Sequence, residues 1–540
     1  MKKIISLLLV ICCMATVCGC GSKSGMSKEE ISKFGNREKT FTLCYFEGGF
    51  GSDWLKAVTE DYMLHVNKDV YISLKPSTDN ETAREKISSQ TGNYDLYRIE
   101  VDMFHKSDAL CELTDLWDMD VPGEAGKKVK DKISADRLEF YNEDGKYYQM
   151  PATSYLGWNW TYNKTLLDKT LGEGNYQLPN TTDEFLAFGE KLFDKGVFLT
   201  AFAGNDTTGG ADYLRYGYEL WFAQMLGLDG YHHYFNCEYK TNGGYEIAKQ
   251  SPENIVQNKN AIEKTYQLAQ TLCQGQKGVE YMHAKSESLS FLDAQFLQYQ
   301  GGYKGSKEYP IAFYYNYSTG EMEMASYIQD GIIQEQDVRA MKMPVISAIR
   351  DRLSTVNDDA TLSAVVDYVD GNAASAPAGV SEEDIAAVKE ARNMVVELVC
   401  REFVISKNAK NVDDIKNFLA YLTSDRAQKI AAQHCNGLPV LNYGYEPTEA
   451  DMGYSFSEFT KSFINIAKSA VFVDYSKFGN PVGRAMGLDW YKDNTTSGGT
   501  LCKNLYSKQA LSADKIYQST LDSFTTNWKD KMEQYFSKKK

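Results

Sequence analysis

Four cysteines close to the start of the chain form the densest group of residues that could bind a metal ion. They are Cys12, Cys13, Cys18 and Cys20. A zinc site is not expected, because Cys18 and Cys20 lack the two-residue gap of zinc ligands and no second Cys or His pair follows nearby. The adjacent His232 and His233 cannot share one face of a helix. We therefore expect neither a metal site nor a cofactor.

The segment that carries these cysteines has the layout of a secretion signal. Its apolar run extends from Ile4 to about Val17, which is shorter than the roughly 20 residues of a membrane-spanning helix. Lysines precede the run and small residues end it, so we expect its removal. The later cysteines are too widely spaced for a disulfide framework, and we interpret most of them as small buried residues: Cys44, Cys111, Cys237, Cys273, Cys400, Cys435 and Cys502.

Composition and motifs disfavour nucleic-acid binding and catalysis. The formal net charge is -15, and the longest basic run is the terminal Lys538 to Lys540, so we expect no nucleic-acid partner. No Ser-His-Asp arrangement, nucleophile elbow or metal-binding His pair stands out. A glycosidase needs two carboxylates about 5 or about 9 Å apart, which a sequence cannot place. We expect no enzyme, and a secreted glycoside hydrolase stays an alternative.

The elements that must position any site indicate two lobes, because 540 residues exceed what one core usually holds. Strand and helix patterns alternate from residue 41 to about residue 101, which predicts an α/β lobe with a largely parallel sheet. An Asp144-Gly145 hairpin turn between tyrosine-rich strands precedes a boundary near residues 149–153. Helices are expected beyond it at residues 182–196, 252–272 and 381–398, before residues 402–430 return to strand, loop and helix.

Several segments resemble those of one protein family in their order and spacing. Val17-Cys18-Gly19-Cys20 is similar to the lipobox of bacterial lipoproteins, and a small polar tether follows it. The later segments are GGFGSDWLKAVTEDY, YDLYRIEV, ALCELTDLWD, YYQMPATSYLGWNWTYNKTLLDK, LPNTTDEFLAFGEKL, DAQFLQYQGG with PIAFYYN, and VISKNAKNVDDIKNFLAYLTSDRAQ with NGLPV. Together they resemble the extracellular solute-binding lipoproteins of bacterial ABC importers, of the carbohydrate-binding (family 1) type. One departure leaves the ligand open: residues 313–316 read FYYN, where many relatives have a Gly-Trp or Trp-Trp element.

The resemblance implies an α/β fold of the periplasmic-binding-protein-like type II class. Two α/β lobes are joined by hinge crossovers in this class, with the ligand cleft between them. The implied divisions are a signal peptide at 1–19, a lipidated Cys20 and flexible tether at 20–39, lobe 1 at 40–150, lobe 2 at 151–400, a segment returning to lobe 1 at 401–445, and C-terminal helices packing on lobe 2 at 446–540.

The resemblance also implies a function. Lobe closure would capture a carbohydrate, expected to be an oligosaccharide, and present it to the permease subunits of an ABC transporter. Lipid on Cys20 would hold a monomer at the extracellular face of the cell membrane. A surface glycan-binding protein without a permease is an alternative, and so is peptide, polyamine or metal cargo.

Aromatic residues are the first candidates for contact with a sugar, because flat rings cover the apolar face of a pyranose while amides and carboxylates bind its hydroxyls. Tyr155, Trp158 and Trp160 form the densest cluster. Trp158 and Trp160 would point to one face of a strand, and that face is either ligand-binding or core. Trp221 follows a helical apolar spacing that suits a core as well as a cleft.

Three other segments supply the remaining candidates. The glycine-rich turn before Phe50, Ser52 and Asp53 allows close backbone approach at a helix start, or is an ordinary helix entry. The carboxyl end of a parallel strand carries Tyr97, Glu100 and Asp102, with a solvated loop and a salt bridge to Arg98 as the alternative. Strand alternation allows only one of Tyr314 and Tyr315 to face a cleft, and Tyr315 and Asn316 are the candidates there.

Overall fold

The computed structural model describes residues 26–77, 80–99, 107–143, 145–154, 156–205, 213–300, 310–397, 399–474, 481–488, 505–506 and 512–538. The chain divides into two compact units. Unit 1 comprises residues up to Ala152 with Arg401–Ala431 and Tyr443–Tyr445, and unit 2 comprises Thr153–Cys400, Ala432–Asn442 and Glu446–Lys540. The expected lobe boundaries were 150/151, 400/401 and 445/446. The predicted signal peptide and Cys20 lie outside the described residues.

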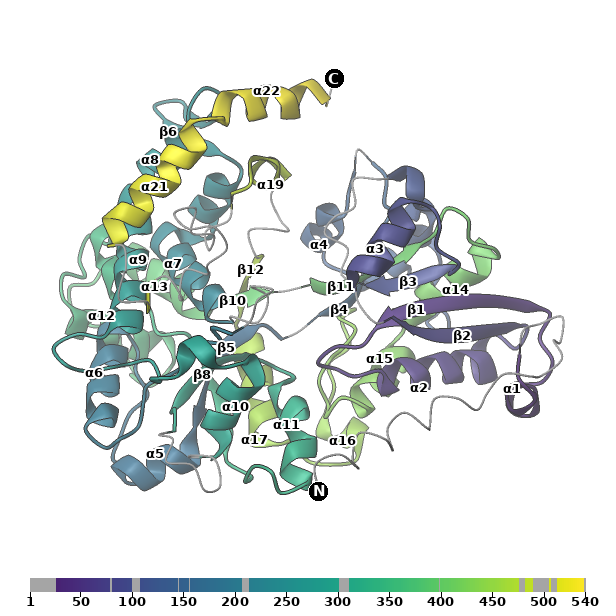
Figure 1. Ribbon diagram of the computed structural model, residues 1–540, viewed down its shortest axis with the longest axis horizontal. Helices are drawn as coiled ribbons and strands as arrows, with labels where there is room; N and C mark the ends of the chain where they lie inside the picture. Colours follow the sequence, from purple (N-terminus) through teal and green to yellow (C-terminus); the bar gives the residue numbers. More distant parts are fainter. Residues whose placement is uncertain are drawn as a thin grey trace, which may run out of the picture. The chain divides into compact units, whose positions relative to one another are not determined.

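Unit 1 is built on a five-stranded sheet in the order β2-β1-β3-β11-β4 (Figure 1). Its strands are β1 (Lys39–Phe46), β2 (Val70–Ser77), β3 (Leu96–Ile99), β4 (Met150–Ser154) and β11 (Val399–Ile405). β1 pairs in parallel with β2 and β3, whereas β11 runs antiparallel to β3. The helices are α1 (Lys28–Phe34), α2 (Asp53–Asp61), α3 (Asn80–Ser88), α4 (Ala135–Phe140), α14 (Val412–Leu422) and α15 (Asp425–Gln433). The expected α/β alternation is therefore present.

The apolar spacing of α2 shows how sequence positions this unit. Trp54 and Val58 lie one turn apart and are fully buried, and Tyr62 continues the same face into a π-helical turn at Tyr62–Val66. The Tyr62 ring packs against Phe418 of α14 at 5.2 Å between centroids. Because α14 comes from the returning segment, distant parts of the chain share one core in this unit.

Unit 2 has a sheet in the order β12-β10-β5-β8, with β9 also paired to β5. These strands are β5 (Trp158–Asn163), β8 (Phe313–Tyr317), β9 (Val338–Met341), β10 (Met394–Glu397) and β12 (Val471–Asp474), and β6 (Glu238–Thr241) and β7 (Gly244–Ile247) form a separate hairpin. The helices are α5 (Lys164–Leu171), α6 (Thr182–Phe193), α7 (Leu214–Phe235), α8 (Glu253–Gln257), α9 (Lys259–Gln274), α10 (Phe291–Gln300), α11 (Gly320–Gln329), α12 (Asp359–Val369), α13 (Glu382–Asn393), α16 (Glu449–Met452), α17 (Glu458–Ala467), α19 (Pro481–Met486), α21 (Ala513–Thr525) and α22 (Trp528–Lys538).

Two local predictions differ from the structure. The helix expected to continue to residue 398 ends at Asn393, because Val395 and Val396 instead pair with β12 as strand β10. At the predicted hairpin turn, Glu143 and Lys146 exchange two backbone hydrogen bonds in an antiparallel bridge, but the described residues beside them form no longer strands, and Asp144 lies outside the described residues. The helices expected at residues 182–196 and 252–272 are present as α6 and as α8 with α9.

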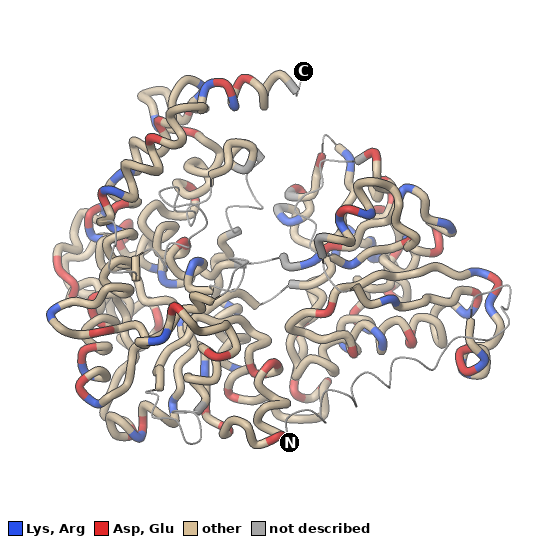
Figure 2. The backbone as a smooth tube through the Cα atoms, viewed as in Figure 1, with Lys and Arg blue, Asp and Glu red and all other residues tan. Residues whose placement is uncertain are grey.

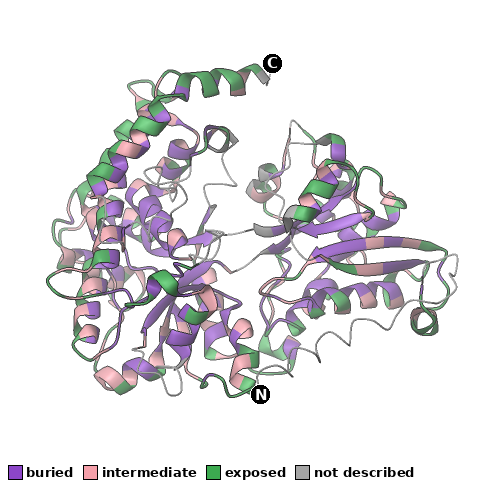
Figure 3. Cartoon of the chain, viewed as in Figure 1, coloured by how far each residue is buried: buried purple, intermediate pink, exposed green. Residues whose placement is uncertain are grey.

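The C-terminal helices pack on unit 2. Ala513 N at the start of α21 donates to Gln270 Oε1 of α9 at 3.2 Å, and the Trp528 Nε1 of α22 donates to the Ala248 carbonyl. Figure 3 shows these helices with much exposed surface, whereas strands β3, β5 and β8 are largely buried. Acidic and basic residues are interspersed over both units (Figure 2). Within the described residues, none of the helices has the length and apolar character needed to cross a membrane.

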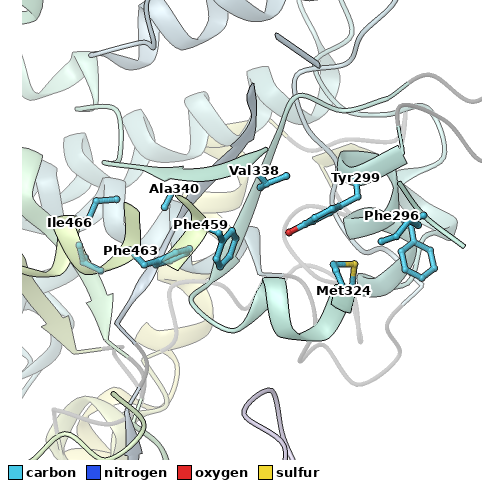
Figure 4. Packing of buried hydrophobic residues seen from close by; sticks show 10 residues of the cluster. Phe296, Tyr299, Met324, Val338, Ala340, Phe459, Phe463 and Ile466 are labelled. Atoms are coloured by element: carbon cyan, nitrogen blue, oxygen red, sulfur yellow. The ribbon is translucent and has the colours of Figure 1, made fainter. Parts of the chain in front are cut away.

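One apolar cluster of unit 2 joins α17 to β9 and to helices α10 and α11 (Figure 4). Phe459 and Phe463 of α17 lie against Val338 and Ala340 of β9, and Phe463 has no exposed surface. The amphipathic spacing of α17 therefore brings a segment that is late in the sequence onto the central sheet.

We expect Phe463→Ala to lower the free energy of unfolding by about 3 to 5 kcal/mol, because it leaves a cavity in this cluster. Urea unfolding followed by circular dichroism measures the loss. Phe472→Ala is the matched control, because Phe472 of β12 is 37% exposed. Equal losses for the two variants would show that the cluster does not stabilise the unit.

Candidate functional site

An aromatic cluster surrounds Trp158 at the start of β5, and we call it the Trp158 cluster. The ring of Trp158 lies 4.5 Å from Tyr213, 4.7 Å from Tyr216 and 4.6 Å from Tyr317, between centroids. Tyr315 lies 6.4 Å away and is nearly parallel to the indole, at 16°. Four tyrosines thus enclose one tryptophan immediately after the chain enters unit 2.

The indole N–H of Trp158 is buried and forms no hydrogen bond with the described residues. A buried donor without a partner is costly. A ligand atom that accepts a hydrogen bond from it therefore gains more binding free energy than one that accepts from an exposed donor. Tyr213 is partly exposed at the start of α7 and brings the cluster toward the surface. The Arg215 guanidinium lies 4.4 Å from the centre of the Tyr216 ring. Rings, a cation and an indole donor are the kinds of groups that bind a polyhydroxylated ring.

The electrostatics keep two phenols of this cluster, those of Tyr213 and Tyr315, neutral. Burial raises the pKa of Tyr213 well above its ordinary value, and the nearby Glu323 carboxylate adds to the shift. Burial likewise raises the pKa of Tyr315, with a further contribution from Glu219. These hydroxyls are therefore hydrogen-bond donors and acceptors, and they carry no charge.

Trp160 and Trp221 lie in the core, which was the stated alternative for both. Neither has exposed surface. The Trp160 ring lies 4.9 Å from Phe185 and 6.3 Å from Trp221, and the Trp221 indole donates to the Pro344 carbonyl at 3.0 Å. We correct both expectations to core packing, because neighbouring helices cover the face of β5 that carries Trp160. Trp158 and Trp160 do share that face, as expected, since both contact Tyr315.

Strand alternation places Tyr315 and Asn316 on opposite faces of β8. Tyr315 faces the tryptophans, whereas Tyr314 belongs to a different apolar cluster with Phe198 and Ile311. Tyr315 and Asn316 are both buried, so in this structure they support the sheet and offer no free surface. Tyr155 lies outside the described residues.

Sequence reasoning named Asn316 but missed Asn159, its neighbour in a polar layer on the other face of this sheet. Asn159 lies opposite Asn316 in the β5–β8 register. Both amide atoms of Asn159 and the Nδ2 atom of Asn316 are buried without hydrogen-bond partners among the described residues. Strand alternation places Asn159 away from the tryptophans, and its polar character in a buried strand was the available signal.

In unit 1 the predicted turn leads into α2. Ser52 precedes the helix and donates to the Glu47 carboxylate instead of capping the helix with its side chain. Phe50 is buried, and Asp53 is exposed and pairs with Lys56 at 2.9 Å. Of the three candidates, only Asp53 presents a polar side chain to solvent.

Tyr97 is also a core residue. It is fully buried in β3 with Cys44 and Val404, and burial raises its pKa to about 12. The physical reason is that β3 lies in the middle of the sheet, between β1 and β11, and both of its faces are covered. Glu100 and Asp102 lie outside the described residues. Arg98 donates to the Phe46 carbonyl at 3.0 Å and lies 4.9 Å from the Trp54 ring centre.

Arg401 is a second residue that sequence reasoning missed. It is 5% exposed, and its guanidinium lies 5.3 Å from the centre of the Phe46 ring at the carboxyl end of β1. A Cβ at Gly48 would lie 2.5 Å from Arg401 Nη1, so the guanidinium packs directly against the backbone of this turn and would have to shift if Gly48 carried a side chain. Gly48 lay within the predicted turn, but its partner comes from the returning segment. The carboxyl edge of the sheet in unit 1 thus holds two buried arginines, Arg98 and Arg401.

Gly157 positions Trp158, and we expect Gly157→Ala to be more destabilising than an ordinary glycine replacement. Gly157 has φ +91°, and a Cβ there would lie 2.0 Å from Val395 Cγ1 of the paired strand β10. The variant therefore combines left-handed strain with overpacking, each of which costs about 1 to 3 kcal/mol.

Gly174→Ala is the control for that measurement. Gly174 has φ +74°, and no atom lies within 4 Å of the position that a Cβ would occupy there, so its replacement adds only the backbone strain. Thermal unfolding of both variants separates the two costs. Equal melting temperatures would mean that β10 does not constrain the start of β5.

No family model and no curated protein matches the chain. Solved structures do match it over most of its length. RafE of Streptococcus pneumoniae in its apo form has 14% sequence identity and a TM-score of 0.55, covering 92% of this chain and 99% of that one. The GacH receptor of Streptomyces glaucescens, solved unliganded and with acarbose, has 13% identity and a TM-score of 0.51, covering 90% and 97%. A protein studied for xylan utilization by Caldanaerobius polysaccharolyticus has 14% identity and a TM-score of 0.56, covering 90% and 99%.

At these identities the likeness shows the fold. The chain has the α/β, periplasmic-binding-protein-like fold of two-lobed solute receptors, as expected from the sequence. Structural neighbours include a RafE complex with raffinose and a chitin oligosaccharide binding protein, so they are bacterial carbohydrate receptors.

Proposed function

We propose that this protein is an extracellular carbohydrate receptor that captures a sugar, expected to be an oligosaccharide, and delivers it to an ABC transporter permease. The observation that carries the proposal is the Trp158 cluster, in which four tyrosine rings surround one indole. The fold supports it, because neighbours with this fold bind raffinose or chitin oligosaccharides. The Trp158 cluster is our candidate site in unit 2, and Gly48 with Arg401 at the carboxyl edge of the sheet is our candidate in unit 1.

The mechanism we infer is ligand-biased closure. A sugar that binds the closed state better than the open state shifts the population toward the closed state. The permease then binds the closed, sugar-loaded protein. Micromolar affinity corresponds to about -8 kcal/mol, which stacked rings and satisfied hydroxyls can supply. No bond of the sugar is made or broken in this scheme.

Two other functions share parts of this evidence. A surface glycan-binding protein would use the same aromatic cluster without a permease. A secreted glycoside hydrolase would need a pair of carboxylates at catalytic separation. Incubation with the bound sugar separates the hydrolase from the receptor, because only the hydrolase releases product.

We expect Trp158→Ala to weaken sugar binding by about 1 to 3 kcal/mol, on the scale of an interface hot spot, because the indole, itself only 4% exposed, holds the tyrosines of the Trp158 cluster in place. The protein starting at Gly21 is first screened by thermal shift against monosaccharides and oligosaccharides, since a ligand of the folded state raises the melting temperature. Calorimetry with the sugar found then gives the affinity of each variant.

Trp221→Phe is the matched control for Trp158→Ala. Trp221 is buried in the same unit and bonds to Pro344, so its replacement lowers stability and leaves the affinity unchanged. Trp158→Phe keeps a ring and is expected to retain part of the affinity. If well-folded Trp158→Ala binds the sugar normally, the cluster is not the binding site.

We also propose that lipid on Cys20 anchors the protein at the outer face of the cell membrane. Cys20→Ala lacks the thiol that would form a thioether with the lipid. The variant is therefore expected to leave the membrane fraction and to carry no radiolabelled palmitate. Cys44→Ala is the control, because Cys44 is a buried core residue. Retention of label in Cys20→Ala would contradict the anchor.

A further inference from the structure

Unit 2 contains a second pocket that shares no lining residue with the Trp158 cluster. Its volume is about 480 Å³, within the range of small-molecule sites. Tyr299 of α10, Glu321 of α11, Val338 of β9 and the loop residues Glu335, Asn436 and Tyr454 line it. All of these residues belong to unit 2. The pocket adjoins the apolar cluster of Figure 4, in which the Tyr299 hydroxyl points toward Val338 and Phe459.

The pocket is acidic, and its described lining carries no counter-charge. Glu321 and Glu335 both line it, and no Lys, Arg or His is among the described lining residues. The basic residues nearby in the sequence pair elsewhere: Arg339 with Asp337 and Glu458, and Lys461 with Glu449 and Glu458. Glu321 accepts a hydrogen bond from Ser457 Oγ at 2.7 Å. Burial raises the pKa of Glu321, and the Glu335 charge raises it further.

Tyr299 is an independent sign of a ligand. Its side chain is 2% exposed and lines the pocket, yet its hydroxyl forms no hydrogen bond with the described residues. Burial raises the pKa of this phenol above its ordinary range, so it stays protonated. The Tyr299 oxygen is not one of the fully enclosed unpartnered atoms, so it reaches the pocket, where a ligand would supply its hydrogen-bond partner.

The remaining walls favour an organic cation over a metal ion. Val338 and Ile328 give an apolar side, and the ring of Tyr454 is exposed at 41%, where it can lie over a cation. No group of three or more His, Cys, Asp or Glu side chains with the geometry of a metal site occurs among the described residues. A neutral sugar would bring no charge to balance the half-buried Glu321 carboxylate, whereas the exposed Glu335 is solvated by water.

We propose that this pocket binds a small organic ammonium compound, with the ammonium between Glu321 and Glu335, its apolar groups against Val338 and Tyr454, and a polar group on Tyr299. This site is separate from the proposed carbohydrate site and stands whether or not that proposal holds.

Choline and 3,3-dimethyl-1-butanol test the proposal, because the two molecules have the same shape and differ in charge. We expect calorimetry on the purified protein to show choline binding at least about tenfold tighter than the neutral analogue. Equal affinities for choline and the neutral analogue would overturn the proposal. So would the absence of any binding of choline, n-butylammonium or spermidine in saturation-transfer NMR at about 10 mM ligand, which is about the weakest affinity of interest.

Isosteric variants locate the site. Glu321→Gln is expected to weaken choline binding about ten- to a hundredfold and Tyr299→Phe several-fold. Glu173→Gln, an exposed change of the same charge outside the pocket, is expected to leave affinity unchanged. If Glu321→Gln does not fold, the exposed Glu335→Gln takes its place. Unchanged affinity in the folded pocket variants would overturn the assignment, as would binding of calcium or a neutral disaccharide in place of choline.

Discussion

Strand β5 is the constraint on which unit 2 depends, because it pairs with β8, β9 and β10 at once. Its alternation sends Trp158 and Trp160 to one face, and Asn159 and Thr161 to the other. A slip of one residue in any of the three pairings would exchange aromatic and polar faces and leave amides among rings. Gly157 admits the strand beside Val395 at a point where the approach is too close for a side chain. The Trp158 cluster thus inherits its geometry from the register of the sheet.

The two faces of β5 have different physical roles. On the aromatic face, Trp160 is enclosed by Phe185, Trp221 and Tyr315. Trp158 lies at the start of the strand, close in sequence to the point where the chain passes from unit 1 into unit 2. On the polar face, Thr161 bonds to Gln298 at 3.1 Å, and Gln298 returns a bond to the Thr161 carbonyl at 2.9 Å. Asn159 lacks such a partner among the described residues. The hydrogen-bonded Gln298 amide fixes the position of the strand, whereas the Asn159 amide, which has no partner among the described residues, lies nearer to the start of the strand.

Sequence periodicity predicted which residues share one face of a strand or helix. It did not predict which other elements cover that face. It predicted that Trp158 and Trp160 share a side and that Trp54 and Val58 face a core, because strand and helix geometry alone decide this. It did not separate Trp158 from Trp160, because coverage by α6 and α7 depends on contacts far along the chain. The strand at 394–397 was missed because its partner, β12, lies more than seventy residues later. Gly48 and Arg401 meet for the same non-local reason, and no local pattern signals it.

The strand order of unit 1 has a consequence for biosynthesis. β4 joins the sheet through β11, yet β11 begins at Val399, long after β4 ends at Ser154. While the ribosome is still producing unit 2, the first sheet therefore lacks its fourth strand and leaves an edge of β3 open to other chains. Closing so long a loop adds little entropic cost once β11 arrives, because that cost grows only with the logarithm of loop length. The length of this vulnerable interval is set by the rate of translation, and chaperones that hold the nascent chain extended would protect that edge.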